Sequence, residues 1–410
     1  MFLSFLHLVC ILLLQILPIL ASLFWNGKDD ILAPRTSGDS SGFSVHAVLG
    51  PASNSSAKTI RRGDGIWFAA DTDYEWYIPI QAGTLPQTIL VQPDTGTPDF
   101  SLMSTLIPVA SRGVAPVYDP SKSSTAVQTP GITWAQGYGD GSIFFTGVIF
   151  RDIITVGGLT VHNYEFEVCE TSKSQVGGAP YGNFGLNIDP AGMPTLPHRI
   201  PSFFPTVMAW LDGKVTTRND PWSLMLFDTD HVTDPVFAVD FHKSTSRGVF
   251  GFGHVDRKKY VGEIAYTLVM ADNGGEWVVS ISGIVVGGTF IKGSFNVIID
   301  TGNRYGFEIP RWALDRHFGQ IPDISWDSYW TTYTFPCDYP LPDLVLGVGD
   351  TGSVRIPGFI IETFKEDKKA NLCRINLHEG GGWGKHIVEL LFVVFDYGNK
   401  RVGLAQKSSY

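Results

Sequence analysis

The chain has 410 residues, of which 44% are hydrophobic, 17% are charged and 45 are glycine, and its formal net charge is −10 at pH 7. This length can supply two lobes with substantial cores, and the many runs of Val, Ile, Thr, Tyr and Phe favour a β-rich protein with many turns. Because no stretch is dominated by lysine and arginine, nucleic-acid binding through a basic patch is not expected.

The first segment, residues 1–22, is predicted to be a secretory signal peptide. Residues Leu8 to Phe24 are almost entirely apolar, and Ile19-Leu20-Ala21-Ser22 offers a small-residue cleavage site. The run is also close to the minimum length for a membrane span, so an uncleaved anchor is the alternative. No second span follows, since the apolar run Val388 to Phe395 has only the length of a strand. We therefore expect a secreted protein without stable membrane association, and a vacuolar or surface-anchored protein is the alternative.

Residues 23–62 are interpreted as a connecting or pro-segment. The segment is rich in Ser, Gly and Ala and ends in the dibasic pair Arg61-Arg62, which a processing protease of the secretory pathway could cleave. It also holds the sequon Asn54-Ser55-Ser56 and the tract Gly38-Asp39-Ser40-Ser41-Gly42. That tract matches a serine-hydrolase elbow on paper, but no strand is predicted before it, so we do not assign it that role.

Short strands and turns are predicted from Trp67 onward. The apolar run Thr88 to Val91 leads into the tripeptide Asp94-Thr95-Gly96, and Asp140-Gly141 and Gly157-Gly158 are turn signals. A helix is predicted around Pro201 to Leu211. The first lobe is therefore assigned to residues 63–236.

The second lobe is assigned to residues 237–410. A new series of strands starts at Pro235 to Asp240, and the run Phe295 to Ile299 leads into a second tripeptide, Asp300-Thr301-Gly302. A second helix is predicted at Pro310 to Phe318.

The repeated tripeptide carries the predicted chemistry. Its two aspartates are 300 − 94 = 206 residues apart and each follows a strand-like run, which indicates two related lobes that supply one carboxylate each. Two carboxyl groups placed face to face do not both ionise easily, so they share a proton, and one acts as a base while the other acts as an acid. This pair can activate water against a peptide carbonyl.

Metal and nucleophile chemistry find little support. The ten histidines form no His-Glu-x-x-His or similar ligand set, so no metal or other cofactor is predicted. Among the four cysteines, Cys10 lies in the predicted signal peptide, and Cys337 and Cys373 could close a loop in an oxidising compartment. Cys169 is interpreted as a buried, small apolar residue rather than a nucleophile.

The chain resembles the pepsin-like aspartic endopeptidases, most closely their secreted fungal branch, from about Trp76 to Lys407. Besides the two tripeptides, the matching stretches are Tyr118 to Ala126, Trp134 to Ser142, Ile154 to Val161, Tyr333 to Cys337, Leu341 to Leu344 and Val393 to Gly403. The resemblance implies a mainly β, bilobed fold with two β-barrel-like lobes and a central cleft. It also implies a peptide or protein substrate and a protein that works as a monomer.

The resemblance assigns roles to the residues of the two tripeptides. Asp94 and Asp300 match the catalytic aspartates, and Thr95 and Thr301 match the threonines whose hydroxyls tie the two active-site loops together. Gly96 and Gly302 leave room for backbone N–H groups to approach the carboxylates. Thr97 supplies the hydroxyl that the family usually has after the first tripeptide.

Three further assignments come from the resemblance. Tyr138 to Ser142 match the tip of the flap that closes over a bound peptide, and Tyr138, Gly139 and Asp140 are its candidate substrate-binding residues. Asp140 could pair with a basic residue of the substrate. Phe184-Gly185 and Trp383-Gly384 match the pairs that brace the catalytic loops, and Cys337–Cys373 matches the disulfide of the second lobe.

Five residues depart from the pattern of the family. Asn303 and Arg304 follow the second tripeptide, where a hydroxyl and a small or apolar residue are usual; Arg304 either favours the charged form of Asp300 or points into a subsite. Ser101 replaces the tryptophan that holds the flap tyrosine, Pro93 removes a ladder donor before Asp94, and Lys385 replaces an acidic residue. Two hypotheses follow: an active acid endopeptidase, and a catalytically impaired homologue that binds a peptide or protein.

Overall fold

The computed structural model describes part of the chain, and the arguments below concern that part. The described residues are 43–51, 60–62, 65–67, 74–112, 116–137, 143–157, 159–174, 182–188, 203, 226–228, 234–271, 274–303, 306–361, 363–367 and 371–410. The predicted signal peptide and the predicted helix at Pro201 to Leu211, except Phe203, lie outside them. Within these ranges no helix is both long and apolar enough to cross a membrane.

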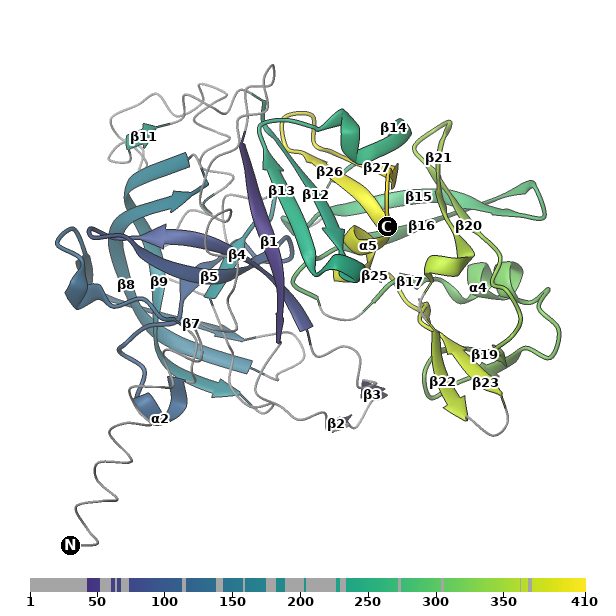
Figure 1. The fold of residues 1–410 in the computed structure, drawn as a ribbon, viewed down its shortest axis with the longest axis horizontal. Helices are drawn as coiled ribbons and strands as arrows, with labels where there is room; N and C mark the ends of the chain where they lie inside the picture. The colour runs from purple at the N-terminus through teal and green to yellow at the C-terminus, as the bar shows by residue number, and fades with distance from the viewer. Residues whose placement is uncertain are drawn as a thin grey trace, which may run out of the picture.

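The fold is mainly β and bilobed, as predicted (Figure 1). The first lobe contains β4 (Tyr74–Ala82), β5 (Gln87–Asp94), β6 (Phe100–Leu102), α2 (Val109–Arg112), η2 (Pro120–Lys122), β7 (Val127–Gly137), β8 (Ile143–Val156), β9 (Leu159–Ser174), β10 (Gly182–Gly185) and β11 (Leu226–Asp228). Strands β7, β8 and β9 form a long antiparallel meander, and β8 also pairs with β4. The short strand β10 lies between β5, to which it is parallel, and β6, to which it is antiparallel.

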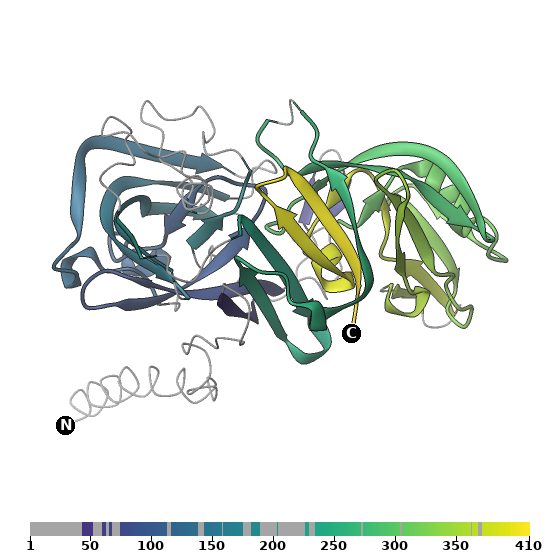
Figure 2. The same cartoon turned by 90° about the horizontal axis from the view of Figure 1, so that it is seen from above.

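A central layer of strands joins the two lobes (Figure 2). It contains β1 (Phe43–Pro51), β12 (Val236–His242), η4 (Lys243–Thr245), β13 (Arg247–Phe252), η5 (Arg257–Lys259), β14 (Tyr260–Leu268), β26 (Leu391–Asp396) and β27 (Arg401–Lys407). In the described part of the chain, these strands continue into the first lobe as one sheet in the order β14-β27-β26-β12-β13-β1-β4-β5. The new strand series predicted at Pro235 is confirmed, because β12 begins at Val236.

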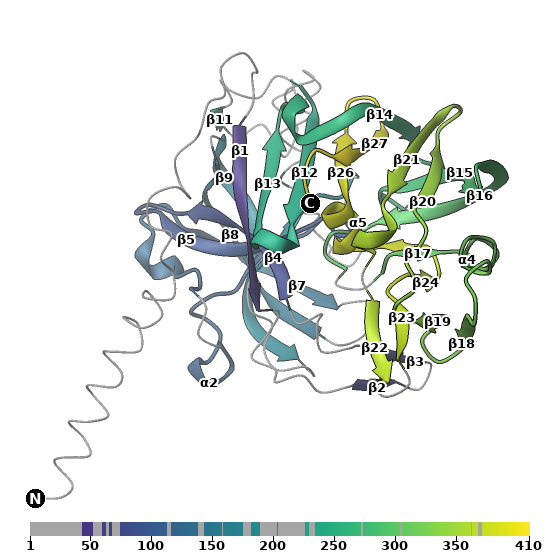
Figure 3. The same ribbon diagram turned by 45° about the vertical axis from the view of Figure 1, so that its right-hand side comes forward.

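Strand β1 lies inside the segment interpreted as a pro-segment. It pairs with β13 along one edge and with β4 at its C-terminal end, and Figure 3 shows it beside β13. The dibasic pair Arg61-Arg62 belongs to β2 (Ile60–Arg62), which pairs with β3 (Gly65–Trp67).

The second lobe contains the remaining elements. They are β15 (Val278–Val286), β16 (Thr289–Ile299), β17 (Glu308–Ile309), α4 (Arg311–Phe318), β18 (Ser325–Asp327), β19 (Thr332–Pro336), β20 (Leu344–Val348), β21 (Gly352–Ile356), η6 (Gly358–Ile360), β22 (Thr363–Asp367), β23 (Leu372–Ile375), β24 (His378–Glu379), β25 (Gly382–Trp383) and α5 (Lys385–Leu390). The predicted helix at Pro310 is confirmed as α4, with Pro310 as its N-cap residue. The strand-length run Val388 to Phe395 is divided between α5 and β26, because the helix ends at Leu390.

Aromatic side chains fill the cores. In the first lobe, the ring of Phe100 packs edge-on against Phe184 with ring centroids 5.5 Å apart. In the central layer, Phe237 stacks on Phe395 at 4.5 Å. All four residues are fully buried or nearly so. Burying such rings provides much of the driving force that holds the strand ends, and therefore the site, in place.

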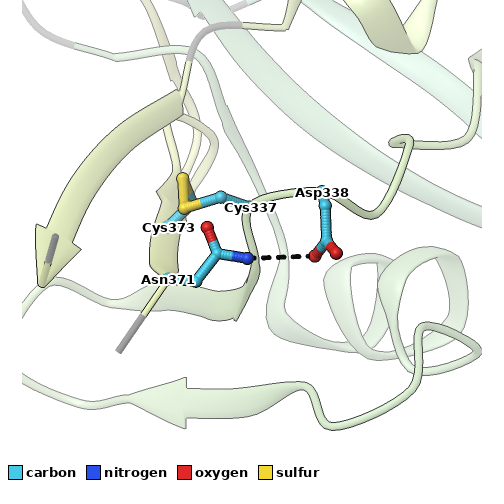
Figure 4. Close-up of a disulfide and its surroundings, with 4 residues drawn as sticks. All are labelled: Cys337, Asp338, Asn371 and Cys373. Atoms are coloured by element: carbon cyan, nitrogen blue, oxygen red, sulfur yellow. Dashed lines mark hydrogen bonds between the residues drawn. A yellow bond between two sulfur atoms is a disulfide. The ribbon is translucent and has the colours of Figure 1, made fainter. Parts of the chain in front are cut away.

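The predicted disulfide between Cys337 and Cys373 is present (Figure 4). It joins β19 to the neighbouring β23 and closes a loop with a sequence separation of 36 residues. Next to it, Asn371 Nδ2 donates to Asp338 Oδ1 over 3.2 Å. Cys169 is buried and free, as the sequence indicated.

Candidate active site

The two aspartates stand at the ends of equivalent strands. Asp94 is the last residue of β5, and Asp300 directly follows β16. Each of these strands has a short parallel neighbour, β10 beside β5 and β25 beside β16. The backbone N–H of Leu186 donates to the carbonyl of Asp94 over 2.8 Å, and that of Asp300 donates to the carbonyl of Trp383 over 2.9 Å. The pairs Phe184-Gly185 and Trp383-Gly384 therefore lie next to Asp94 and Asp300, where the resemblance places the pairs that brace the two loops.

The two threonines lock the loops together. The Thr95 N–H donates to Thr301 Oγ1 over 3.1 Å, and the Thr301 N–H donates to Thr95 Oγ1 over 2.9 Å. Each hydroxyl then donates across to the other loop, Thr95 Oγ1 to the Ile299 carbonyl at 2.7 Å and Thr301 Oγ1 to the Pro93 carbonyl at 2.8 Å. All of these groups are buried, so the four bonds fix the two loops without competition from water.

The two glycines make room for the carboxyl group of the opposite loop. A Cβ atom on Gly96 would lie 2.5 Å from Asp300 Oδ1, and one on Gly302 would overlap the Asp94 carboxyl group. The backbone N–H groups also approach, as predicted: Gly96 donates to Asp94 Oδ1 over 2.9 Å, and Gly302 donates to Asp300 Oδ1 over 3.0 Å. The absence of side chains at these positions is therefore what lets the two acids face each other.

The pKa of each carboxyl group is raised, but unequally. Burial raises the pKa of Asp94 well above its usual range, and the charge of Asp300 and a hydrogen bond with it raise it further. Burial also raises the pKa of Asp300, but the hydrogen bond with Asp94 and the N–H groups of Gly302 and Asn303 pull it back. The pKa of Asp94 is thus raised further than that of Asp300, and the two carboxyl groups titrate as a pair.

Thr97 and Asn303 support the site differently from the family pattern. The Thr97 hydroxyl interacts with Asp99, from whose N–H it accepts over 3.2 Å, and with Gln136 Nε2 at 3.4 Å. Asn303 uses its backbone N–H, which donates to Asp300 Oδ1 over 3.2 Å. The predicted flap residues Tyr138, Gly139 and Asp140, together with Arg304, lie outside the described residues, which resume on either side of them.

Sequence reasoning missed one polar contact to the pair of acids. Asn183 of β10 donates from Nδ2 to Asp94 Oδ2 over 3.4 Å and is only 4% exposed. The available signal was an amide in the tract Gly182-Asn183-Phe184-Gly185, every residue of which is buried.

A buried charged network behind Asp300 was also missed, although Lys385 had been noted. Lys385 Nζ lies 3.9 Å from Glu75 Oε2, and both side chains are almost completely buried. Gln92 Nε2 donates to Glu75 Oε2 over 3.1 Å and to the Gly302 carbonyl over 3.2 Å. The Lys385 N–H donates to the Asn303 carbonyl over 2.9 Å. The cation at position 385 is thus matched by an acid from the other lobe.

Among the residues that the structure describes, no group of three or more His, Cys, Asp and Glu side chains is arranged to hold a metal ion. The site itself consists of two facing carboxyl groups with fixed hydrogen-bond donors.

Comparison with known proteins adds the family. A family profile described as eukaryotic aspartyl protease matches residues 75–407. Podosporapepsin of Podospora anserina is 30% identical over 353 residues, which cover 82% of this chain and 75% of that protein. Endothiapepsin of Cryphonectria parasitica is 30% identical over 334 residues (79% and 73%), and penicillopepsin-1 of Penicillium janthinellum is 28% identical over 343 residues (82% and 96%).

Proposed function

Because this chain belongs to the eukaryotic aspartyl protease family, we propose that it is a secreted aspartic endopeptidase that cleaves peptide bonds in acidic solution. The observation that carries the proposal is the pair Asp94 and Asp300, buried together with unequally raised pKa values. The substrate is an extended peptide or protein segment in the cleft between the lobes, and the protein acts as a monomer.

The two acids act on one water molecule. Ionised Asp300 takes a proton from the water, whose oxygen forms a bond to the carbonyl carbon of the substrate. Protonated Asp94 gives its proton to the carbonyl oxygen, and a tetrahedral species results. Asp300, now protonated, gives its proton to the leaving nitrogen, and Asp94 takes a proton from a hydroxyl of the tetrahedral species as the carbon–nitrogen bond breaks, so the pair returns to its starting state. No covalent enzyme intermediate is needed.

The remaining assigned residues hold and cover this pair. Thr95, Thr301, Gly96 and Gly302 keep the loops at the required distance, and Thr97 supports the first loop through Asp99. By the resemblance to the family, we assign Tyr138, Gly139 and Asp140 to a flap over the bound peptide, with Asp140 favouring a basic residue in the substrate.

Acidic working pH follows from the shared proton. When both carboxyl groups are protonated the base is lost, and when both are ionised the acid is lost, so activity is confined between the two apparent pKa values of the pair. A rate profile that peaks at neutral or alkaline pH would contradict the proposal.

The chain is organised as a precursor. Residues 1–22 form the signal peptide, residues 23–62 the pro-segment, residues 63–236 the first lobe and residues 237–410 the second lobe. The pairing of β1 with β4 and β13 supports a pro-segment that is part of the folded precursor. Cleavage after Arg62 would give a mature protein that begins near Gly63, and N-terminal sequencing of secreted protein tests this boundary.

The alternative is a homologue that binds peptides without cleaving them, and the departures at Ser101, Asn303 and Arg304 favour it. One experiment separates the two functions: acid-activated protein is incubated with denatured haemoglobin, with and without the transition-state mimic pepstatin. Cleavage that pepstatin blocks and that disappears in Asp94→Asn and Asp300→Asn supports the endopeptidase. Tight binding of peptides without products supports the alternative.

A further inference from the structure

We propose that Asn183 is a further catalytic residue, whose side-chain amide stabilises the negative charge that Asp94 carries once it has given up its proton. The inference rests on the proposed endopeptidase function and concerns the same site. It is carried by the position of Asn183 in β10 and by the hydrogen bond from its Nδ2 to Asp94 Oδ2.

The strand pairing explains why the side chain of Asn183 reaches the acids. In β10, Asn183 is opposite Gln92 of β5 and Ser101 of β6. Successive side chains of a strand point to opposite faces. Phe184, the next residue, packs into the aromatic core against Phe100 and Phe203. Asn183 must therefore point away from that core, toward the end of β5 where Asp94 stands.

An amide at this position requires an explanation. Asn183 is 4% exposed, and all four residues of β10 are buried. Burying an amide without a partner costs about 1 to 3 kcal/mol, so a polar residue in such a strand needs a specific contact. The contact that the structure provides is the Asp94 carboxylate at 3.4 Å.

With Asn183 included, each of the two carboxylates accepts at least two hydrogen bonds. Asp300 accepts from two backbone N–H groups, those of Gly302 and Asn303. Asp94 accepts from the N–H of Gly96 on Oδ1 and from Asn183 on Oδ2. The hydroxyl of Thr97 interacts with Asp99 and Gln136 instead. Asn183 thus supplies the second donor to Asp94, whereas a backbone group supplies the second donor to Asp300.

The donor matters most after proton transfer. When Asp94 protonates the carbonyl oxygen of the substrate, its carboxyl group becomes a carboxylate in a buried place. A hydrogen bond to a charged group is stronger than one to a neutral group, so the amide favours this product of the transfer. Since the amide does not titrate, it supplies the bond at every working pH.

In the part of the chain that the structure describes, the titratable groups that shift the pKa of Asp94 all oppose its ionisation. Asp300 faces it from the loop after β16, and Asp99 approaches from the loop before β6. Glu167 of β9 is also buried, and the pKa of Glu167 is raised by burial and by the charge of Asp99. A neutral donor at position 183 is therefore a way to ease the ionisation of Asp94 without a further charge.

The test compares Asn183→Leu, which keeps the approximate size but removes the donor, with the unchanged protein on a peptide substrate. We expect kcat to fall about ten-fold with KM changed less than about two-fold, because the bond forms fully only after proton transfer. The alkaline limb of the pH profile should move upward by about half to one pH unit, because Asp94 then holds its proton more tightly. Gln81→Leu is the control, since the Gln81 amide donates to Thr88 on β5 and not to the acids.

The outcomes separate the inference from the proposed function. If the unchanged protein does not cleave, the endopeptidase function fails. If it cleaves and Asn183→Leu gives the same kcat and the same pH profile, or changes KM alone, the inference is overturned and Asn183 is a subsite residue. Thermal unfolding checks that the variant is folded. If it is not, Asn183→Ser, which is too short to reach Asp94, is measured with the same two expectations.

Discussion

Replacement of Thr301 by valine tests whether the threonine pair holds the site together. Valine has almost the same shape as threonine, so the change removes the hydroxyl without opening a cavity. Two buried groups of the opposite loop then lose their partner on Thr301: the Thr95 N–H, at 3.1 Å in the structure, and the Pro93 carbonyl, at 2.8 Å.

The expected cost is the desolvation of those two groups. Each buried donor or acceptor without a partner costs about 1 to 3 kcal/mol, so Thr301→Val should destabilise the protein by about 2 to 6 kcal/mol. With about 1 to 1.5 °C for each kcal/mol in a protein of this size, the thermal midpoint should fall by about 2 to 9 °C. The loops are also no longer fixed relative to each other, and a shift of about 1 Å between the acids can cost about 100-fold in activity.

Thr301→Ser is the matched control, because it keeps the hydroxyl and loses one methyl group, worth about 1 kcal/mol. Thermal unfolding and kcat/KM are measured for both variants at the same acidic pH. If Thr301→Val and Thr301→Ser have the same thermal midpoint and the same kcat/KM, the Thr301 hydroxyl does not tie the two loops together and the reasoning is refuted.

Three further changes have defined outcomes. Gly302→Ala places a methyl group on the Asp94 carboxyl, so kcat/KM should fall at least about 100-fold while the fold survives by circular dichroism; an active variant would contradict the facing of the acids. Loss of the disulfide by the double change Cys337→Ser and Cys373→Ser releases a loop with a sequence separation of 36 residues and should cost about 3 to 4 kcal/mol in urea unfolding; an unchanged midpoint would show that β19 and β23 need no crosslink. Burial would raise the pKa of Asp240, but a hydrogen bond from His242 and the charges of Lys407, His242 and Lys259 lower it to about 2. This lies below the value of about 3.9 in the unfolded chain, so the stabilisation is present above about pH 4 and is lost as the pH falls through about 2. The free energy of unfolding of Asp240→Asn should therefore be lower than that of the unchanged protein by about 2 to 3 kcal/mol at a pH of about 5, and equal to it below a pH of about 2. An equal loss at both pH values would exclude the interactions of the Asp240 carboxylate as the cause.

The sequence by itself determined the elements that local chemistry encodes. The apolar runs before each Asp-Thr-Gly predicted strands, and both aspartates stand at strand ends, Asp94 closing β5 and Asp300 following β16. Pro310 predicted the start of α4, because its fixed backbone suits a helix N-terminus. The two cysteines of the last quarter were identified as a candidate crosslink, which β19 and β23 complete.

Only the tertiary structure decided how these elements act on one another. The bond from Asn183 to Asp94 joins residues 89 positions apart, and Lys385 meets Glu75 from the other lobe. No local pattern of hydrophobic and polar residues encodes such contacts, because they depend on which strands become neighbours. The sequence also does not distinguish the two acids, because Asp94 and Asp300 stand in identical tripeptides. In the proposed mechanism Asp94 is the acid that holds the proton and Asp300 is the ionised base, because burial, the charge of Asp300 and a hydrogen bond with it raise the pKa of Asp94 further than that of Asp300.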